Sequence, residues 1–142
     1  MTNIVAKAEI TVEAPVGQVW KALTDPDTIA KYFFGTHVET DWEPGSPIVW
    51  TGEYEGKRYQ DNGKVLDVEP NRLLRMTHFS PTSGQPDEPE NYHTVTYALD
   101  EDDGSTLVSL SQDNNGSDAE AERATANWNI VLSGLKNTIE GG

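Results

Sequence analysis

Apolar and polar side chains alternate over residues 4–12, which is the pattern of a strand with one buried face. The spacing changes at Pro15, because apolar residues then recur three and four positions apart over residues 15–23. That spacing predicts a short helix with one apolar face, and a second short helix is expected over residues 26–33. Neither helix is long enough to be stable alone, so both must pack against the rest of the chain.

Strand-like runs separated by turn residues fill the middle of the chain. Six are expected, over residues 37–40, 47–54, 58–68, 72–79, 91–99 and 106–112. The last two form a hairpin around the acidic turn DEDDGS, and a polar loop precedes them at residues 80–90. Gly63 is expected to mark a β-bulge within the third run.

The clearest helical periodicity comes last, over residues 117–140. Its apolar stripe consists of Ala121, Ala124 or Thr125, Trp128, Leu132, Leu135 and Ile139. Consecutive strands joined by hairpins indicate an antiparallel sheet with the helices gathered on one side, so the predicted fold class is α+β. One domain over residues 1–142 is expected, in which a curved sheet of six to seven strands wraps around the long C-terminal helix and two short helices plug one end.

Charge and composition narrow the range of partners. The chain has 10 basic and 24 acidic residues, a net charge of −14, which argues against nucleic acid and anionic membranes as partners. It has no cysteine, which excludes disulfides, thiol nucleophiles and cysteine-ligated zinc. No apolar run approaches the length of a membrane span, and the N-terminal segment does not resemble a signal peptide. A cytoplasmic protein without membrane insertion is therefore expected, and its acidity fits either plain solubility or a salty cytoplasm.

Residue spacing gives little support to metal or nucleophilic chemistry. The three histidines lie on separate predicted strands, so no metal site is expected, and there is no G-x-S-x-G motif. No catalytic residue is assigned. His78 shares its parity with Leu74 and Met76, so it is expected to face the concave side of the sheet, where it could bind a ligand or act as an acid or base.

Aromatic residues are the stronger signal. On a curved sheet under a helix, they would line an apolar cavity with a few polar tips, which is the usual make-up of a small-molecule pocket. The alternative is that the rings fill the core to normal density. The candidate cavity residues are Phe33, Trp50, Tyr54, Met76, His78, Tyr97, Trp128 and Leu132.

Several motifs are spread over nearly the whole chain. I-x-V-x-A-P-x-x-x-V-W-x-A-L-T-D-P occupies residues 10–26, and G-x-V-x-x-V-x-P-x-x-x-L occupies residues 63–74. V-T-Y-x-L and G-x-T-L-V-x-L follow within residues 95–110, and W-x-x-x-L-x-x-L-K-x-x-I occupies residues 128–139. In this order they resemble the START-like, or SRPBCC, superfamily of the birch-pollen allergen and polyketide cyclases. Within it, they are most similar to the branch named after the activator of the heat-shock-protein-90 ATPase.

The resemblance implies a helix-grip fold, and it favours a binding protein for a hydrophobic or amphipathic small molecule such as a lipid, polyketide or aromatic metabolite. The cavity is expected between the curved sheet and the C-terminal helix, and no cofactor is expected. Two alternatives stay open: a co-chaperone-like domain with a chaperone partner, and a cyclase or hydrolase that uses His78, Tyr54 or Arg75 as acid or base. The chain could be a monomer or a homodimer.

Overall fold

The computed structural model describes residues 4–33, 35–54, 56–80 and 86–141, apart from the side chain of Tyr54. Within them, seven strands form one antiparallel sheet in the order β1-β7-β6-β5-β4-β3-β2. The strands are β1 (Ile4–Val12), β2 (His37–Glu39), β3 (Pro47–Tyr54), β4 (Lys57–Glu69), β5 (Leu73–His78), β6 (His93–Asp102) and β7 (Ser105–Asn115). The helices are α1 (Val16–Thr24), α2 (Pro26–Tyr32) and α3 (Asp118–Gly141), with a short 3-10 turn, η2 (Pro89–Asn91).

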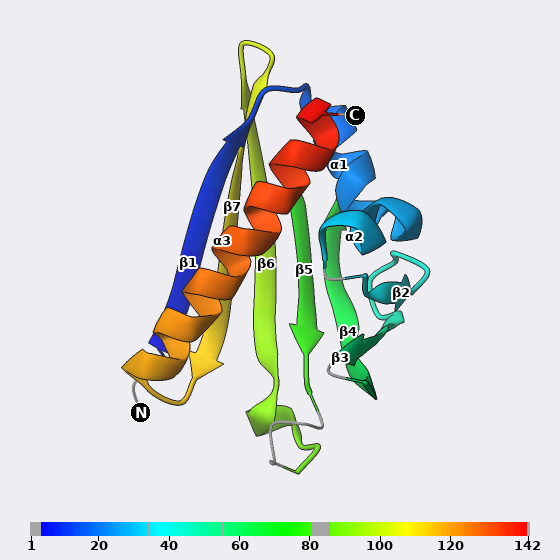
Figure 1. The fold of residues 1–142 in the computed structure, drawn as a ribbon, viewed down its shortest axis with the longest axis vertical. Helices are drawn as coiled ribbons and strands as arrows, with labels where there is room; N and C mark the ends of the chain where they lie inside the picture. The colour runs from blue at the N-terminus through cyan, green and yellow to red at the C-terminus, as the bar shows by residue number, and fades with distance from the viewer. Residues whose placement is uncertain (1–3, 34, 55, 81–85, 142) are drawn as a thin grey trace.

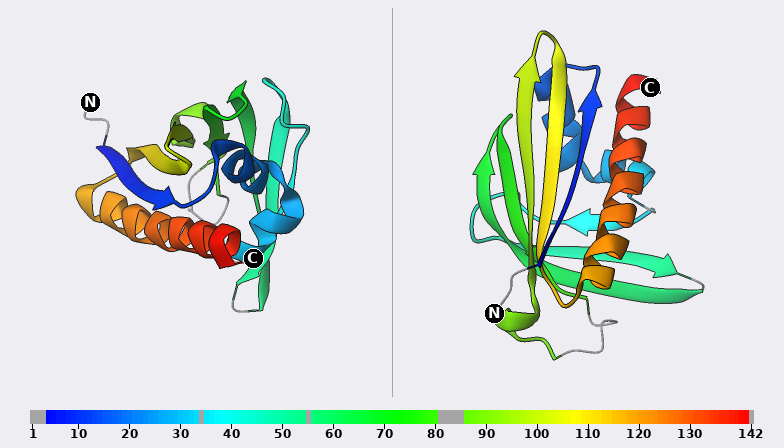
Figure 2. Two further views of the ribbon diagram at one scale, coloured as in Figure 1. Left: turned by 90° about the horizontal axis from the view of Figure 1, so that it is seen from above. Right: turned by 90° about the vertical axis from the view of Figure 1, so that its left-hand side faces the viewer.

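The sheet curves around α3, and the two short helices close one end of the concave face (Figures 1 and 2). α3 begins beside β1 and β7 and crosses the face diagonally, so that its C-terminal turns lie near α1 and α2 (Figure 1). The predicted α+β helix-grip architecture is therefore confirmed, with seven strands and with two short helices after the first strand.

The long strand β4 joins the two halves of the sheet. It pairs with β3 over residues 57–64 and with β5 over residues 65–69. The bulge expected at Gly63 is not there, because the register against β5 shifts between Val65 and Asp67. Gly63 instead marks a close approach of two backbones: a Cβ atom there would lie 1.8 Å from the carbonyl oxygen of Thr77. A missing side chain can thus signal close contact between strands as well as a bulge.

One hydrophobic core lies between the sheet and the helices. α1 contributes the buried side chains of Val19 and Leu23, whereas Trp20 on the same predicted face is only partly buried. α3 contributes Leu132 and its neighbours Val131 and Leu135. No helix among the described residues is long and apolar enough to cross a membrane.

The C-terminal end of α3 is tied to the turn after β1. Glu13 donates its backbone N–H to Glu140 Oε2 at 2.8 Å, and Lys136 Nζ donates to the same oxygen at 2.6 Å and to the carbonyl oxygen of Thr11 at 2.9 Å. The Glu13 N–H, followed by Lys136, lowers the pKa of Glu140 from its usual 4.5. A carboxyl with a lowered pKa in the folded state stabilises the fold above its unfolded pKa, and that contribution is lost as the pH falls through the folded pKa.

Glu140→Gln should therefore lower the melting temperature slightly at neutral pH, by about 2 °C or less, since the pair is exposed. The difference from the wild type should disappear once the pH is well below 4.5. Glu122→Gln is the matched control, because it removes the same charge from an exposed position of α3. A difference between Glu140→Gln and the wild type that persists unchanged in acid would contradict this role of the carboxylate.

Candidate functional site

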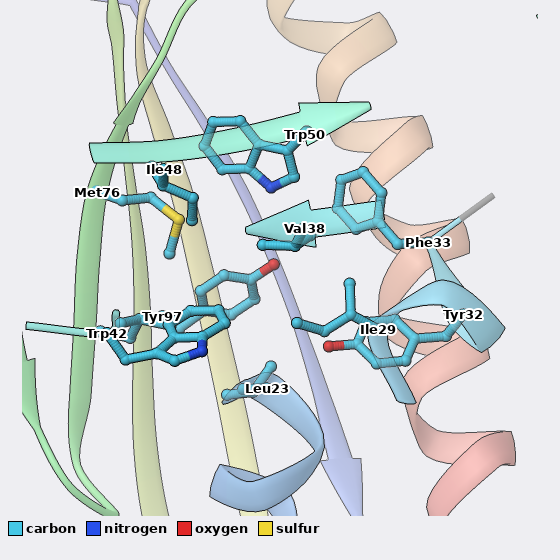
Figure 3. A pocket seen from close by; sticks show the side chains of 11 residues that line it. Leu23, Ile29, Tyr32, Phe33, Val38, Trp42, Ile48, Trp50, Met76 and Tyr97 are labelled. Atoms are coloured by element: carbon cyan, nitrogen blue, oxygen red, sulfur yellow. The ribbon is translucent and has the colours of Figure 1, made fainter. Parts of the chain in front are cut away.

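An apolar pocket lies between the concave face of the sheet and the two short helices (Figure 3). Its walls come from α1, α2, β2, β3, β5, β6 and the loop before β3. The lining residues are Leu23, Ile29, Tyr32, Phe33, Val38, Trp42, Ile48, Trp50, Leu74, Met76 and Tyr97. The pocket encloses about 30 Å³, which is room for about one water molecule and well below the roughly 300–1,000 Å³ of typical ligand pockets.

Two ring tips point into this pocket without a hydrogen-bond partner. Figure 3 shows the Tyr97 hydroxyl and the Trp50 indole nitrogen directed toward its middle. Both side chains are buried, with 7% and 8% exposed, and within the residues that the structure describes neither polar atom makes a hydrogen bond. Burial raises the pKa of the Tyr97 hydroxyl far above its usual 10, so it stays protonated and can donate.

Tyr32 provides a contrast on the opposite wall. It is also buried, and burial raises the pKa of its hydroxyl, but that hydroxyl donates to the carbonyl oxygen of Ala22 at 3.0 Å. Leaving a buried polar group unpaired costs about 1–3 kcal/mol, so most such groups in proteins have partners. Asp61 Oδ1 is the only fully buried side-chain polar atom without a partner among the described residues, so the unpaired tips of Tyr97 and Trp50 remain accessible from the pocket into which they point.

Trp42 also lines the pocket, from the loop between β2 and β3. Its backbone has φ 58°, in the left-handed region that bulky residues rarely adopt. A residue kept in that conformation must be held by its surroundings, and such strain is often found where a protein clamps a ligand. The sequence placed Trp42 in a turn and outside the candidate site, although a tryptophan in so polar a turn was a usable signal.

The eight candidate residues of the sequence fall into five groups. Phe33, Trp50, Met76 and Tyr97 line the pocket. Trp128 lies behind the lining, edge-to-face against Phe33 and Tyr97 at centroid distances of 5.8 and 6.3 Å. Leu132 belongs to the core and His78 to the polar pair described below, while the side chain of Tyr54 lies outside the described residues.

The pocket is not where the sequence placed it, beneath the long helix, because no lining residue comes from α3. The reason is the diagonal course of α3, which lies mainly against β1 and leaves the β3–β5 side to the short helices (Figure 1). In addition, Trp128 donates its indole N–H to Gln112 Oε1, at 2.8 Å. The seven lining residues that the sequence did not select are Leu23, Ile29, Tyr32, Val38, Trp42, Ile48 and Leu74.

A polar pair adjoins the pocket on the same face of the sheet. His78 Nε2 lies 3.0 Å from Asp61 Oδ2, and the His78 ring packs edge-to-face against Trp50 at 4.9 Å. Asp61 is the cross-strand partner of Trp50. The ring of His93 stacks on His78 at 6.4 Å. In the part of the chain that the structure describes, no group of three or more histidine and acidic side chains is placed to hold a metal ion.

Comparison with known proteins places this fold in a family. The family model described as "Activator of Hsp90 ATPase homolog 1-like protein" matches residues 13–140. The chain belongs to this family. The chain is thus a member of the SRPBCC superfamily, as the motifs of its first and last helices indicate.

Solved structures agree with this assignment. ChR145 from Cytophaga hutchinsonii is 43% identical to this chain, with 97% of this chain and 94% of ChR145 covered and a TM-score of 0.85. The Aha1 dimer from Colwellia psychrerythraea is 22% identical, with 99% of this chain and 97% of that chain covered and a TM-score of 0.74. Ara h 8.0201 is 14% identical, with 99% of this chain and 100% of that chain covered and a TM-score of 0.77. At these identities, both structures show the shared fold alone. A search of curated proteins gave no match.

Proposed function

We propose that this chain binds a hydrophobic or amphipathic small molecule, with an aromatic or aliphatic body and at least one hydrogen-bond acceptor, in the pocket between the sheet and the two short helices. The proposal rests chiefly on the tips of Tyr97 and Trp50, which point into the apolar pocket and have no hydrogen-bond partner among the described residues. A domain that served only as a packed scaffold would gain nothing from directing two donors without acceptors into an apolar pocket. A ligand carbonyl or hydroxyl oxygen supplies the acceptor that they lack.

Binding requires the pocket to enlarge, because about 30 Å³ does not hold even a single aromatic ring. The movable parts are on the helix side of the pocket. α2 has only seven residues, and Phe33 at its end is partly buried against Trp128. The sheet side is fixed by continuous strand pairing at Trp50, Met76 and Tyr97. The ligand therefore displaces Phe33 and the Trp42 loop while the donors on the sheet stay in place.

Tyr97→Phe tests this proposal directly. It removes the unpaired hydroxyl and leaves the ring, so stability should stay unchanged or rise by up to about 1 kcal/mol. Affinity for 2-naphthol, a probe with an acceptor oxygen, should fall about tenfold, which corresponds to one lost hydrogen bond. Both effects can be measured, by urea unfolding and by NMR titration against naphthalene as the acceptor-free counterpart.

Tyr59→Phe is the matched control. The Tyr59 hydroxyl forms a 2.7 Å hydrogen bond with Thr36 Oγ1 outside the pocket lining, so its removal should lower stability and leave naphthol affinity unchanged. A Tyr97→Phe variant that is destabilised and binds 2-naphthol like the wild type would contradict the proposal.

A co-chaperone-like role is the second candidate, and the family description favours it. The acidic chain would then bind a basic patch on a chaperone of the heat-shock-protein-90 type, as a monomer or as a dimer like the Aha1 of Colwellia psychrerythraea. Stimulation of such a chaperone's ATPase by the wild type and equally by Tyr97→Phe would favour this role over the pocket.

A further inference from the structure

The Asp61–His78 pair has the geometry of a base and its orienting carboxylate. His78 Nε2 lies 3.0 Å from Asp61 Oδ2. Because an ionised carboxylate can only accept hydrogen bonds, we assign the hydrogen to Nε2, which leaves a lone pair on Nδ1. Among the described residues, Nδ1 has no hydrogen-bond partner. Base and orienter are thus hydrogen-bonded, and the reactive nitrogen is unoccupied.

Burial separates the roles of the two side chains. Asp61 is only 16% exposed and its Oδ1 is fully buried, without a partner among the described residues, whereas 28% of the His78 side chain is exposed. The carboxylate is therefore the more buried of the two groups, and the imidazole beside Trp50 is partly exposed. A buried oxygen without a partner is costly and calls for an explanation, and a catalytic role is one such explanation.

Trp50 connects this pair to the pocket. It lines the pocket, packs on the His78 ring at 4.9 Å, and pairs with Asp61 across β3 and β4. A molecule that displaces Phe33 and lies against Trp50 therefore approaches His78 with its body in an apolar site. His93 lies beyond His78, and its Nδ1 is held 2.8 Å from the carbonyl oxygen of Asp113, so it is not part of the pair.

We propose that His78 is a general base, positioned by Asp61, that removes a proton from a carbonyl or aromatic compound held against Trp50. The proposal rests on the ligand-binding function inferred for the pocket. In the step, the lone pair of Nδ1 takes a proton from an acidic carbon next to a carbonyl group, and the electrons of the C–H bond form the enolate. Asp61 stabilises the imidazolium that results, and the proton returns to another atom of the same molecule, so that the overall change is an isomerisation.

The probe is 5-nitrobenzisoxazole, which needs only a base. Loss of its C3 proton converts the C–H electrons into a C≡N bond and breaks the N–O bond, giving a yellow 2-cyano-4-nitrophenolate. The wild type should accelerate this reaction with saturation, and His78→Gln should reduce kcat/KM about 10²-fold. Asp61→Asn should lower kcat more than it raises KM, because it disorients the base and does not touch the probe.

Two further measurements separate chemistry from structure. Added imidazole should restore turnover to His78→Ala, which a merely structural histidine would not show. His93→Gln is the matched control and should keep wild-type rates, because its ring is a neighbour of His78 and not of the pocket. Binding is followed independently by NMR with 5-nitroindazole, an unreactive analogue of nearly the same size.

The outcomes separate this proposal from the pocket function. If 5-nitroindazole binds and turnover is the same in the wild type and His78→Gln, the assignment of His78 as the general base is wrong, and the binding function of the pocket stands. The assignment of His78 is also wrong if imidazole fails to restore turnover to His78→Ala while 5-nitroindazole still binds. If the wild type neither binds the analogue nor turns over the probe, both proposals fall.

Discussion

Leu132→Ala is expected to lower the free energy of unfolding by about 2–5 kcal/mol. The side chain is 1% exposed in the middle of α3, within the core formed by the sheet and the helices. Truncation removes apolar contacts and leaves a cavity that a helix held against β1 cannot readily close. Urea unfolding monitored by circular dichroism measures the loss.

Ile130→Ala is the control for this prediction. Ile130 lies two residues earlier on α3 with 57% of its surface exposed, so its truncation should change stability by no more than about 0.5 kcal/mol. Leu132→Ala should also leave the affinity for 2-naphthol unchanged, because Leu132 is not part of the pocket lining. Equal losses in the two variants would mean that α3 does not pack as described.

Two glycine-to-alanine changes should have opposite signs. Gly63→Ala places a Cβ atom 1.8 Å from the Thr77 carbonyl oxygen, so β4 and β5 must move apart, at a cost of about 2 kcal/mol or more. Because a backbone atom is in the way, no side-chain rotation relieves the clash. Gly17→Ala lies in α1, where a Cβ atom meets only Asn71 Oδ1 at 4.0 Å, and it should stabilise by up to about 1 kcal/mol.

The two variants share the same chemical change, so their difference isolates the local environment. It can be read from the midpoints of urea unfolding at unchanged m-value. A Gly63→Ala protein as stable as the wild type would contradict the close approach of β4 to β5. That approach also sets the position of Met76, so Gly63→Ala should weaken ligand binding as well.

The alternation of residues was sufficient to predict most strands. β1 matches the predicted range of residues 4–12, because an edge strand with one buried face alternates cleanly. The hairpin of β6 and β7 is longer than predicted, since its strands continue to Asp102 and from Ser105. Only Asp103 and Gly104 form the turn, with φ 54° and 84°, as in a type I′ hairpin. Polar strand ends look like turns when the sequence is considered alone.

The pocket was predictable only on its sheet side. Parity placed Trp50 and Met76 on the concave face, because alternate residues of a strand share a face. Periodicity could not show which part of that face α3 covers, so Leu132 was selected for a cavity that its helix does not reach. The position of Trp42 in the pocket wall depends on a left-handed backbone conformation in a loop, and the periodicity of the sequence does not predict such a conformation. The pairing of Asp61 with His78 was not predicted, because the two residues are 17 positions apart in the sequence.

The tryptophan indole N–H signals provide the most direct test of the pocket as a ligand site. On titration of ¹⁵N-labelled protein with 2-naphthol, the signals of Trp42 and Trp50 should shift, because both residues line the pocket and the Trp50 nitrogen gains an acceptor. The signal of Trp20, which lies outside the pocket, should stay nearly unchanged. Unchanged Trp42 and Trp50 signals up to the solubility limit, or a shift of Trp20 alone, would contradict the assignment of this pocket as the binding site.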